Sequence, residues 1–217
     1  MKQDIIFFDL DGTIVDSAPG ILASVKYALS HFGIEEKDEE KLNFFIGPPL
    51  FDAFSKLYNM DKKDADTAVE KYRENYNENG AIEKFFVYDG VEEMLKTLRD
   101  EGFTISLATA KPLEFAERIL EKADLSKYFH VLNGASFDET KRTKSAVIAD
   151  TIKTNNFPKE RILMVGDREN DVSGAIKNGI DVLGVLYGYG DEEELKKAGC
   201  RRIANTPADV VRMIMNK

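Results

Sequence analysis

The sequence predicts an α/β fold, in which a parallel sheet carries helices on both faces and an all-helical domain is inserted near its start. Two patterns support this prediction. From about residue 84 onward, apolar strand-like runs alternate with amphipathic helical stretches, as in right-handed βαβ units. Between residues 15 and 83 only helical periodicity is found. We therefore expect a core domain of residues 1–14 and 84–217 and a helical domain of residues 15–83.

The first strand is predicted where Ile and Phe follow one another at residues 5–8. It ends in Asp9 and Asp11, which strand alternation places on the same side. Gly12 then ends the strand and allows the backbone to approach a ligand closely. A solvated turn is the alternative interpretation. However, two carboxylates at the mouth of a buried strand are costly without a cation, and Mg²⁺ prefers oxygen ligands.

The inserted stretch shows apolar residues at steps of three and four, which predict a first helix from Ser17 to Gly33. Gly47-Pro48-Pro49 then breaks the chain, because proline cannot continue a helix from its interior. Further helical stripes follow, and no strand is expected between residues 15 and 83.

The second half of the chain alternates between strands and helices. Asp89, followed three residues later by Glu92, predicts a helix N-cap. Pro112 predicts the start of a later helix. Strands are expected at residues 104–109, 131–132, 161–165, 182–185 and 203–204, and helices at 89–102, 112–123, 144–154, 170–177, 192–198 and 207–215.

Polar residues follow several of these predicted strands. In open α/β sheets, binding sites form outside the carboxyl ends of the strands. Each such residue taken alone is also typical of a helix cap or a solvated turn, but their joint placement at one edge favours a functional site. The candidates are Asp9, Asp11, Thr109, Ala110, Lys111, Lys144, Asp167 and Asp171.

These residue types together indicate phosphoryl chemistry. An aspartate nucleophile can accept a phosphoryl group, and this splits a difficult hydrolysis into two easier steps. A second carboxyl two residues away can protonate the leaving oxygen and then deprotonate the attacking water. Mg²⁺ and a lysine would neutralise the phosphate oxygens, while a threonine and backbone N–H groups orient them.

The same residues resemble the four ordered motifs of the haloacid dehalogenase superfamily, and the resemblance covers nearly the whole chain. It implies a Rossmann-like core with a helical cap domain, as in the phosphoglycolate phosphatase and 5′-nucleotidase-like branch. The segment Val185-Leu186-Tyr187-Gly188-Tyr189-Gly190 also looks like that branch. The matching motifs are Asp9-Leu10-Asp11-Gly12-Thr13, then Thr109, then Lys144, and last Gly166-Asp167-Arg168-Glu169-Asn170-Asp171.

The resemblance implies a role for each matching position. Asp9 would be the nucleophile and a metal ligand, and Asp11 the general acid and base, with its backbone carbonyl on the metal. Asp167 would bind Mg²⁺, and Asp171 would support the metal site or the lysine. The phosphate would be bound by Gly12, Thr109, Ala110 and Lys144.

Two assignments stay open at this point. Lys141 lies three residues before Lys144, so either could be the lysine of the third motif. Lys144 is favoured because it directly precedes an apolar helix. Lys111 follows Thr109 closely, and the sequence assigns it no role.

Composition limits the partners and the compartment. The net charge of −9 disfavours binding to nucleic acid or to an anionic membrane surface. No apolar run reaches the ~20 residues that cross a membrane, and no signal peptide is visible. The one cysteine, Cys200, excludes an internal disulfide and fits a reducing compartment. We expect a cytoplasmic monomer or homodimer that acts on a small phosphorylated metabolite.

Other functions are weighed against a phosphatase. A receiver-type phospho-switch also uses an acidic Mg²⁺ site, but it has no use for Asp11 and lacks an insertion of about seventy residues after its first strand. A phosphomutase would need a cap that rebinds a bisphosphate intermediate.

The substrate is expected to be small and phosphoglycolate-like, with a nucleoside monophosphate as the alternative. A Pro-Pro loop is stiff and suits a segment that closes over a substrate. Flanking aromatic rings could stack on a base or seal a small pocket. The residues expected to face the substrate are Phe45, Gly47, Pro48 and Phe51.

Overall fold

In the computed structural model, which describes residues 3–47, 49–136 and 143–216, the chain divides into two compact units. The core unit comprises Met1–Asp16 and Val87–Lys217, and the helical unit comprises Ser17–Phe86. The sequence placed the insertion at residues 15–83, slightly earlier at both ends.

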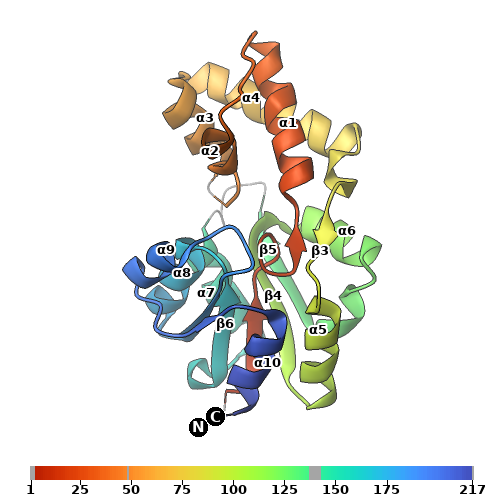
Figure 1. Ribbon diagram of the computed structural model, residues 1–217, viewed down its shortest axis with the longest axis vertical. Helices are drawn as coiled ribbons and strands as arrows, with labels where there is room; N and C mark the ends of the chain where they lie inside the picture. The colour runs from red at the N-terminus through yellow and green to blue at the C-terminus, as the bar shows by residue number, and fades with distance from the viewer. Residues whose placement is uncertain (1–2, 48, 137–142, 217) are drawn as a thin grey trace. The chain divides into compact units, whose positions relative to one another are not determined.

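The core unit is built on a parallel six-stranded sheet with the order β5-β4-β1-β6-β7-β8 (Figure 1). The chain starts at the central strand β1, builds outward on one side through β4 and β5, and then returns to the other side. The topological switch point therefore lies beside β1, where open α/β sheets form their sites. The strands are β1 (Ile5–Phe8), β4 (Thr104–Pro112), β5 (Val131–Ala135), β6 (Ile162–Gly166), β7 (Asp181–Val185) and β8 (Ile203–Ala204).

Helices cover both faces of this sheet, as the sequence predicted. One face carries α7 (Lys144–Asn155) and α8 (Glu169–Asn178), which pack on Phe7 of β1 and Met164 of β6. In Figure 1, α5 (Val91–Asp100) and α10 (Pro207–Met215) lie on the opposite face and contact each other. The remaining helices of the core unit are α6 (Leu113–Lys122), η3 (Ser126–Tyr128), η4 (Lys159–Arg161) and α9 (Glu192–Lys197).

The burial of β1 explains why its sequence is an uninterrupted apolar run. Ile6, Phe7 and Phe8 are each fully buried. Because side chains alternate between the two faces of a strand, a strand covered on both sides needs apolar residues at every position. The fold class predicted from the sequence is confirmed.

Two local predictions differ from the structure. Strand β4, which was predicted to end at residue 109, continues to Pro112 and shifts its register against β5 after Thr109, so Ala110 and Lys111 also lie on the strand. The predicted N-cap at Asp89 is wrong. Gly90 precedes α5 with φ +84°, a left-handed conformation that glycine adopts at no steric cost, and it takes the cap position.

A small second sheet was not predicted. Val15–Asp16 (β2) pairs with Phe86–Val87 (β3) in a two-stranded sheet, where the chain passes from one unit to the other. Strands of two residues are too short to produce a recognisable periodicity. Sequence patterns therefore gave no indication of them.

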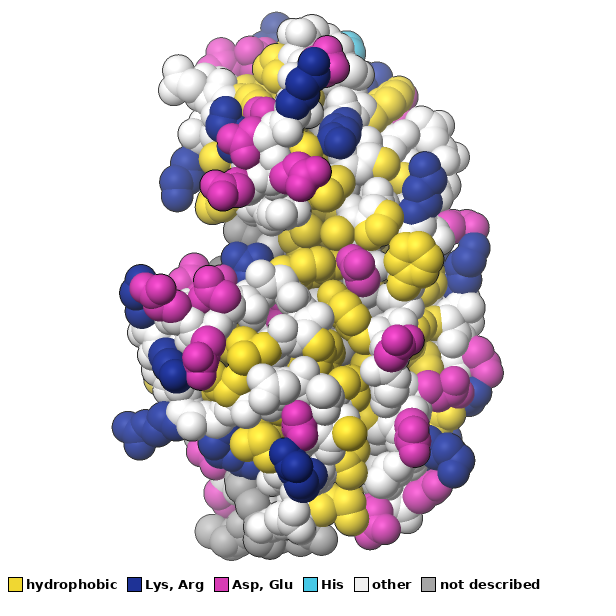
Figure 2. Space-filling view, in the orientation of Figure 1, with side chains coloured by type: hydrophobic (Ala, Val, Ile, Leu, Met, Phe, Trp, Pro, Cys, Tyr) yellow, Lys and Arg dark blue, Asp and Glu magenta, His cyan; other side chains and the backbone are white. Residues whose placement is uncertain are grey.

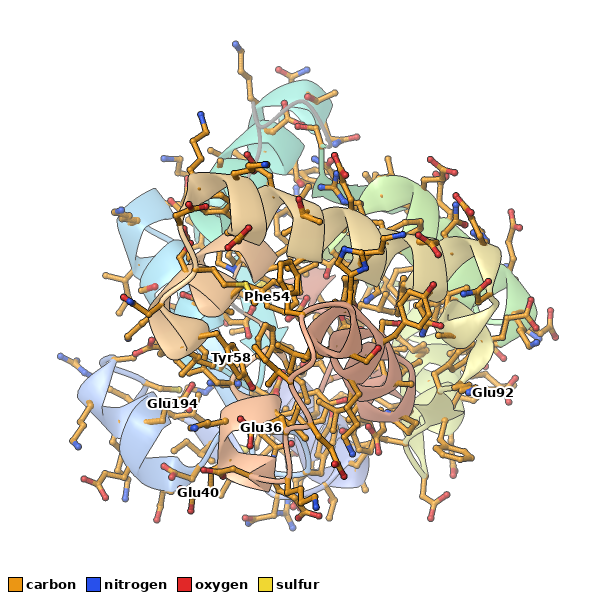
Figure 3. All side chains as sticks on the ribbon, turned by 90° about the horizontal axis from the view of Figure 1, so that it is seen from above. Glu36, Glu40, Phe54, Tyr58, Glu92 and Glu194 are labelled. Carbon is orange, nitrogen blue, oxygen red and sulfur yellow. The ribbon has the colours of Figure 1, made fainter. Side chains whose placement is uncertain are left out.

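The helical unit packs its longest helix, α1, against α4 and the π-helical turn η1 that follows. Gly20 lets the backbones approach closely, since a Cβ there would lie 2.3 Å from the carbonyl oxygen of Ala81. Phe45 packs on Phe54 with ring centroids 4.7 Å apart, and Tyr58 of the same helix as Phe54 donates a hydrogen bond to Glu36 (Figure 3). The helices are α1 (Ala18–His31), α2 (Glu39–Asn43), α3 (Leu50–Tyr58), α4 (Lys62–Arg73), η1 (Glu74–Glu78) and η2 (Ala81–Glu83).

The surface is charged and mixed. On the face drawn in Figure 2, Lys and Arg side chains are scattered among Asp and Glu side chains and do not form one basic patch. Across the described part of the chain, every helix is too short or too polar to span a bilayer.

The packing of β1 leads to a stability prediction. Phe7 is fully buried and lies 6.0 Å, between ring centroids, from Phe157, whereas Phe86 is 67% exposed. Phe7→Ala should lower the free energy of unfolding by about 3–5 kcal/mol, because it removes buried area and leaves a cavity. Phe86→Ala, the same chemical change at an exposed position, should cost within about 0.5 kcal/mol. Urea denaturation followed by circular dichroism measures both, and equal effects would contradict the central position of β1.

Candidate active site

The candidate site lies in the core unit at the carboxyl edge of its sheet. Asp9 and Asp11 follow β1, and Asp167 directly follows β6. The two strands are neighbours and parallel, and the backbone N–H of Asp9 donates to the carbonyl of Val165 at 3.0 Å. Parallel pairing thus brings carboxylates from distant parts of the sequence to one edge.

Lys144 is the cation at the centre of this cluster. Its Nζ lies 2.5 Å from Oδ1 of Asp9 and 2.9 Å from Oδ1 of Asp171, and it donates to the carbonyl oxygen of Ala108 at 3.0 Å. Its side chain is 3% exposed. The amine therefore joins the end of β1 to helix α8 and to strand β4.

The position of Lys144 in its helix is electrostatically unusual. It is the first residue of α7, whose start is capped by the hydroxyl of Thr143, and a cation at a helix N-terminus opposes the helix dipole. Burial also lowers the pKa of the amine, but the carboxylates of Asp171 and Asp9 outweigh it and raise the pKa. Their charges thus keep the lysine protonated at this place.

Asp167 is fully buried and held by two hydrogen-bond donors. The hydroxyl of Thr13 donates to its Oδ1 at 3.1 Å, and the backbone N–H of Tyr189 donates to its Oδ2 at 2.9 Å. Burial, together with the nearby charges of Asp171 and Asp9, raises the pKa of Asp167 well above its ordinary value. Burial likewise raises the pKa of Asp9 to about 6, against the opposing effect of Lys144.

Asp11 has its own cation. The Nζ of Lys111 lies 2.9 Å from Oδ2 of Asp11, and the lysine side chain is 6% exposed. The backbone N–H of Lys111 donates to the hydroxyl of Thr109 at 3.2 Å. The lysine to which the sequence assigned no role is therefore the ion-pair partner of the second aspartate.

Two glycines allow the acidic groups to come this close. A Cβ on Gly12 would lie 2.1 Å from Oδ2 of Asp167, and its φ of +82° also disfavours other residues. A Cβ on Gly166 would lie 2.2 Å from Cγ of Asp171. Larger residues at either position would displace a carboxylate.

The geometry fits a divalent cation. One oxygen from each of Asp9, Asp167 and Asp171 can lie within 4.8 Å of the others. With Asp11 included, four carboxyl groups face two lysines, so this group of side chains has an excess of two negative charges when all four are ionised. Asp171 pairs with the cation Lys144, whereas Asp167 accepts hydrogen bonds from the neutral donors Thr13 and Tyr189. Asp167 is therefore better suited than Asp171 to bind Mg²⁺ together with Asp9, which follows the neighbouring strand.

The structure brings together the predicted core residues Asp9, Asp11, Gly12, Thr109, Lys144, Asp167 and Asp171. Ala110 lies between Thr109 and Lys111 on β4. Lys141 and Pro48 lie outside the described residues.

The residues expected to face the substrate lie in the helical unit. Phe45 is 2% exposed and packs against Phe54, whereas Phe51 is half-buried and Gly47 is exposed. In this conformation the ring of Phe45 is part of the aromatic interior of that unit. Phe51 and Gly47 keep accessible surface.

Sequence reasoning gave no role to Thr13, Lys111 and Tyr189, which contact the site carboxylates. In the sequence, Thr13 was recognised only as the last residue of the motif that begins at Asp9, without a role of its own. Tyr189 lies in a glycine-rich run after β7, and nothing in that run indicates that its backbone contacts Asp167. Such contacts depend on the tertiary arrangement of loops, which leaves no periodic pattern in the sequence.

Known proteins with similar sequences catalyse phosphoryl chemistry. A 5′-nucleotidase from Pseudomonas aeruginosa is 40% identical over 90% of this chain and 88% of its own length. A phosphoglycolate phosphatase from Vibrio parahaemolyticus is 28% identical over 98% of this chain and 97% of its own. The tyrosine-protein kinase PtkA from Mycobacterium tuberculosis is 35% identical over 90% of this chain, but the match spans only 66% of that protein.

The fold is shared with a solved structure as well. The crystal structure of a predicted phosphatase from Clostridium acetobutylicum superimposes with a TM-score of 0.95 and 41% identity, and the match covers 100% of both chains. Residues 6–185 also match the family described as haloacid dehalogenase-like hydrolase, a span that contains every motif of the candidate site. The chain therefore belongs to the haloacid dehalogenase-like hydrolase family.

Proposed function

We propose that this phosphatase of the haloacid dehalogenase-like family hydrolyses small phosphomonoesters with Mg²⁺ and forms a phosphorylated intermediate on Asp9. One observation carries the proposal. The buried amine of Lys144 bridges Asp9 and Asp171 beside the fully buried Asp167, at the switch point of the sheet. This arrangement combines a nucleophile, a cation for phosphate and a carboxylate pair suited to a metal.

In the first step, a carboxylate oxygen of Asp9 attacks the phosphorus of the substrate. A bond forms between that oxygen and phosphorus, and the bond from phosphorus to the leaving oxygen breaks. Asp11 gives a proton to the leaving oxygen, so the alcohol departs neutral. Asp11 must enter this step protonated, and Lys111, whose Nζ lies 2.9 Å from Oδ2 of Asp11, then stabilises the carboxylate that the transfer leaves.

In the second step, water attacks the phosphorus of the aspartyl phosphate. Asp11 accepts a proton from this water, the bond between Asp9 and phosphorus breaks, and inorganic phosphate leaves. The carboxylate of Asp9 is restored for the next cycle. A receiver-type switch must preserve its phosphate, so a carboxyl two residues from the nucleophile favours turnover.

Fixed charges and dipoles orient the phosphoryl group in both steps. Lys144 neutralises negative charge on the phosphate oxygens, while the hydroxyl of Thr109 and the backbone N–H of Ala110 orient them. The backbone N–H of Gly12, which was also expected to bind phosphate, donates instead to the carbonyl oxygen of Val15 at 2.9 Å. Bound by Asp9 and Asp167, Mg²⁺ would offset the remaining negative charge. A rigid, buried set of donors acts without reorganisation during the reaction.

For the substrate we propose a nucleoside 5′-monophosphate, with phosphoglycolate as the second candidate. The 5′-nucleotidase is the more similar of the two phosphatase relatives named above, at 40% against 28% identity. Sequence patterns alone favoured the phosphoglycolate-like substrate. In the helical unit, Phe45 is buried while Phe51 keeps accessible surface, so Phe51 is the better candidate to stack on a base.

The nucleophile assignment predicts that Asp9→Asn abolishes phosphate release from an aryl phosphate in the presence of Mg²⁺. An amide is a poor nucleophile and a weaker metal ligand. Asp100→Asn, on the exposed end of α5, serves as the matched control and should leave turnover unchanged. Undiminished activity of Asp9→Asn would remove Asp9 from the mechanism.

A second prediction concerns Lys144. Lys144→Ala should lower kcat/KM by roughly 10²–10³-fold, as for loss of a preorganised electrostatic group. It should also destabilise the protein by about 3–5 kcal/mol, because two buried carboxylates lose their partner. Thermal melting separates the two effects. Lys153→Ala, at an exposed position of the same helix, is the control.

Lys141→Ala decides between the two candidate lysines of the third motif, and its effect on turnover should be mild. The reverse ranking of Lys141→Ala and Lys144→Ala would move the phosphate-binding role to Lys141.

The substrate proposal predicts the outcome of a phosphate-release screen over nucleoside monophosphates, phosphoglycolate and sugar phosphates. A nucleoside 5′-monophosphate should give the highest kcat/KM, and Phe51→Ala should then raise KM more than it lowers kcat. A higher kcat/KM for phosphoglycolate than for any nucleoside monophosphate would reverse the order of the two candidates. Transfer of phosphate from ATP to a tyrosine peptide, tested in parallel, would instead indicate a kinase like PtkA.

A further inference from the structure

The segment Gly188–Tyr189–Gly190, which follows β7, lies directly against Asp167. The backbone N–H of Tyr189 donates to Oδ2 of Asp167 at 2.9 Å. A Cβ on Gly188 would lie 2.1 Å from the carbonyl oxygen of Gly12, and a Cβ on Gly190 would lie 1.9 Å from that of Asp167. Both glycines are therefore required for this close approach.

The side chain of Tyr189 ties the segment to another part of the site. Its hydroxyl donates to Oδ1 of Asp16 at 2.8 Å. Asp16 ends β2, only a few residues after Asp11 and Gly12. Tyr189 thus joins the loop after β1 to the carboxylate of Asp167, with its side chain on one and its backbone on the other.

A second contact holds the other side of the Asp167 loop. Glu194 of α9, labelled in Figure 3, accepts hydrogen bonds from Nε of Arg168 and from the backbone N–H of Glu169, both at 2.8 Å. The chain from residue 188 to 194 therefore contacts Asp167 and both residues that follow it. These contacts restrict how the loop, and with it the carboxylate, can move.

We propose that Gly188–Tyr189–Gly190 sets the orientation of the Asp167 carboxylate for metal binding, with Tyr189 as a positioning residue that acts through Asp167. Each carboxylate oxygen can accept more than one partner, so the donors Thr13 and Tyr189 leave lone pairs for a metal. Partners of a metal ligand that fix its orientation commonly contribute 10–100-fold to metal affinity. This inference rests on the metal site of the proposed function.

Tyr189→Phe tests the inference, because it removes the hydroxyl bond to Asp16 and keeps the ring. Binding of Mn²⁺, followed through the electron paramagnetic resonance signal of the free ion, should weaken roughly tenfold. The Mg²⁺ concentration for half-maximal activity should rise by a similar factor, while KM for the substrate at saturating Mg²⁺ stays unchanged. Melting of the metal-free variant checks that its fold is intact.

Tyr187→Phe is the matched control, since it makes the same change two residues earlier. The buried Tyr187 hydroxyl has no hydrogen-bond partner among the described residues, so Mn²⁺ affinity should not change. Asp16→Ala combined with Tyr189→Phe should weaken Mn²⁺ binding by less than the two single changes added together, because both remove the bond between the two residues.

The outcomes separate the two proposals. Wild-type protein that binds no Mn²⁺ and needs no Mg²⁺ would overturn the metal site itself. If the wild-type protein binds Mn²⁺ and Tyr189→Phe binds it with equal affinity, only the positioning role of Tyr189 is overturned. A tenfold loss in Tyr187→Phe as well would also overturn it, since the effect would then come from packing and not from the bond to Asp16.

Discussion

The ion pairs of Lys144 are the interaction on which the rest of the site depends. A buried amine and buried carboxylates are each costly alone, and they become tolerable only together. Because Asp9 follows β1, Asp171 lies in α8 and Lys144 begins α7, the compensation requires the central strand and both helices to be in place. The ion pairs of the site can therefore form only when the helices of this sheet face are packed in place.

The charges that remain explain why the fold suits phosphoryl transfer. Burial raises the pKa of Asp9 and of Asp167, because a buried carboxylate loses its hydration, and the neighbouring carboxylate of Asp171 adds to this effect. A divalent cation would complete the charge balance that Lys144 and Lys111 begin, and with these lysines it would also attract the negatively charged phosphate group. The carboxylates are thus held in place before a metal binds, and a bound cation would relieve the repulsion between them.

Much of this architecture could be predicted because its causes are local. The run Ile5–Phe8 is apolar at every position, and strands covered on both faces require that pattern. Asp9, Asp11 and Asp167 follow such strands, so topology alone placed them together. The roles of Lys111 and Tyr189 could not be predicted, because their partners Asp11 and Asp16 are far away in the sequence. The N-cap of α5 was predicted wrongly for a different reason. Gly90 adopts a left-handed backbone conformation and takes the cap position that the sequence pattern assigned to Asp89.

The pairing of β1 has a consequence for how the chain acquires its fold during synthesis. Ile5 pairs with Thr104 on one side and with Ile162 on the other. Strand β1 leaves the ribosome before either of these partners, so it waits for strands from the middle and the last third of the chain. The contacts of Ser17–Phe86, by contrast, are largely internal, so this unit can form while β1 is still unpaired. Long-range pairing of this kind slows folding, and until it is complete a fully apolar strand is exposed to aggregation or chaperone binding.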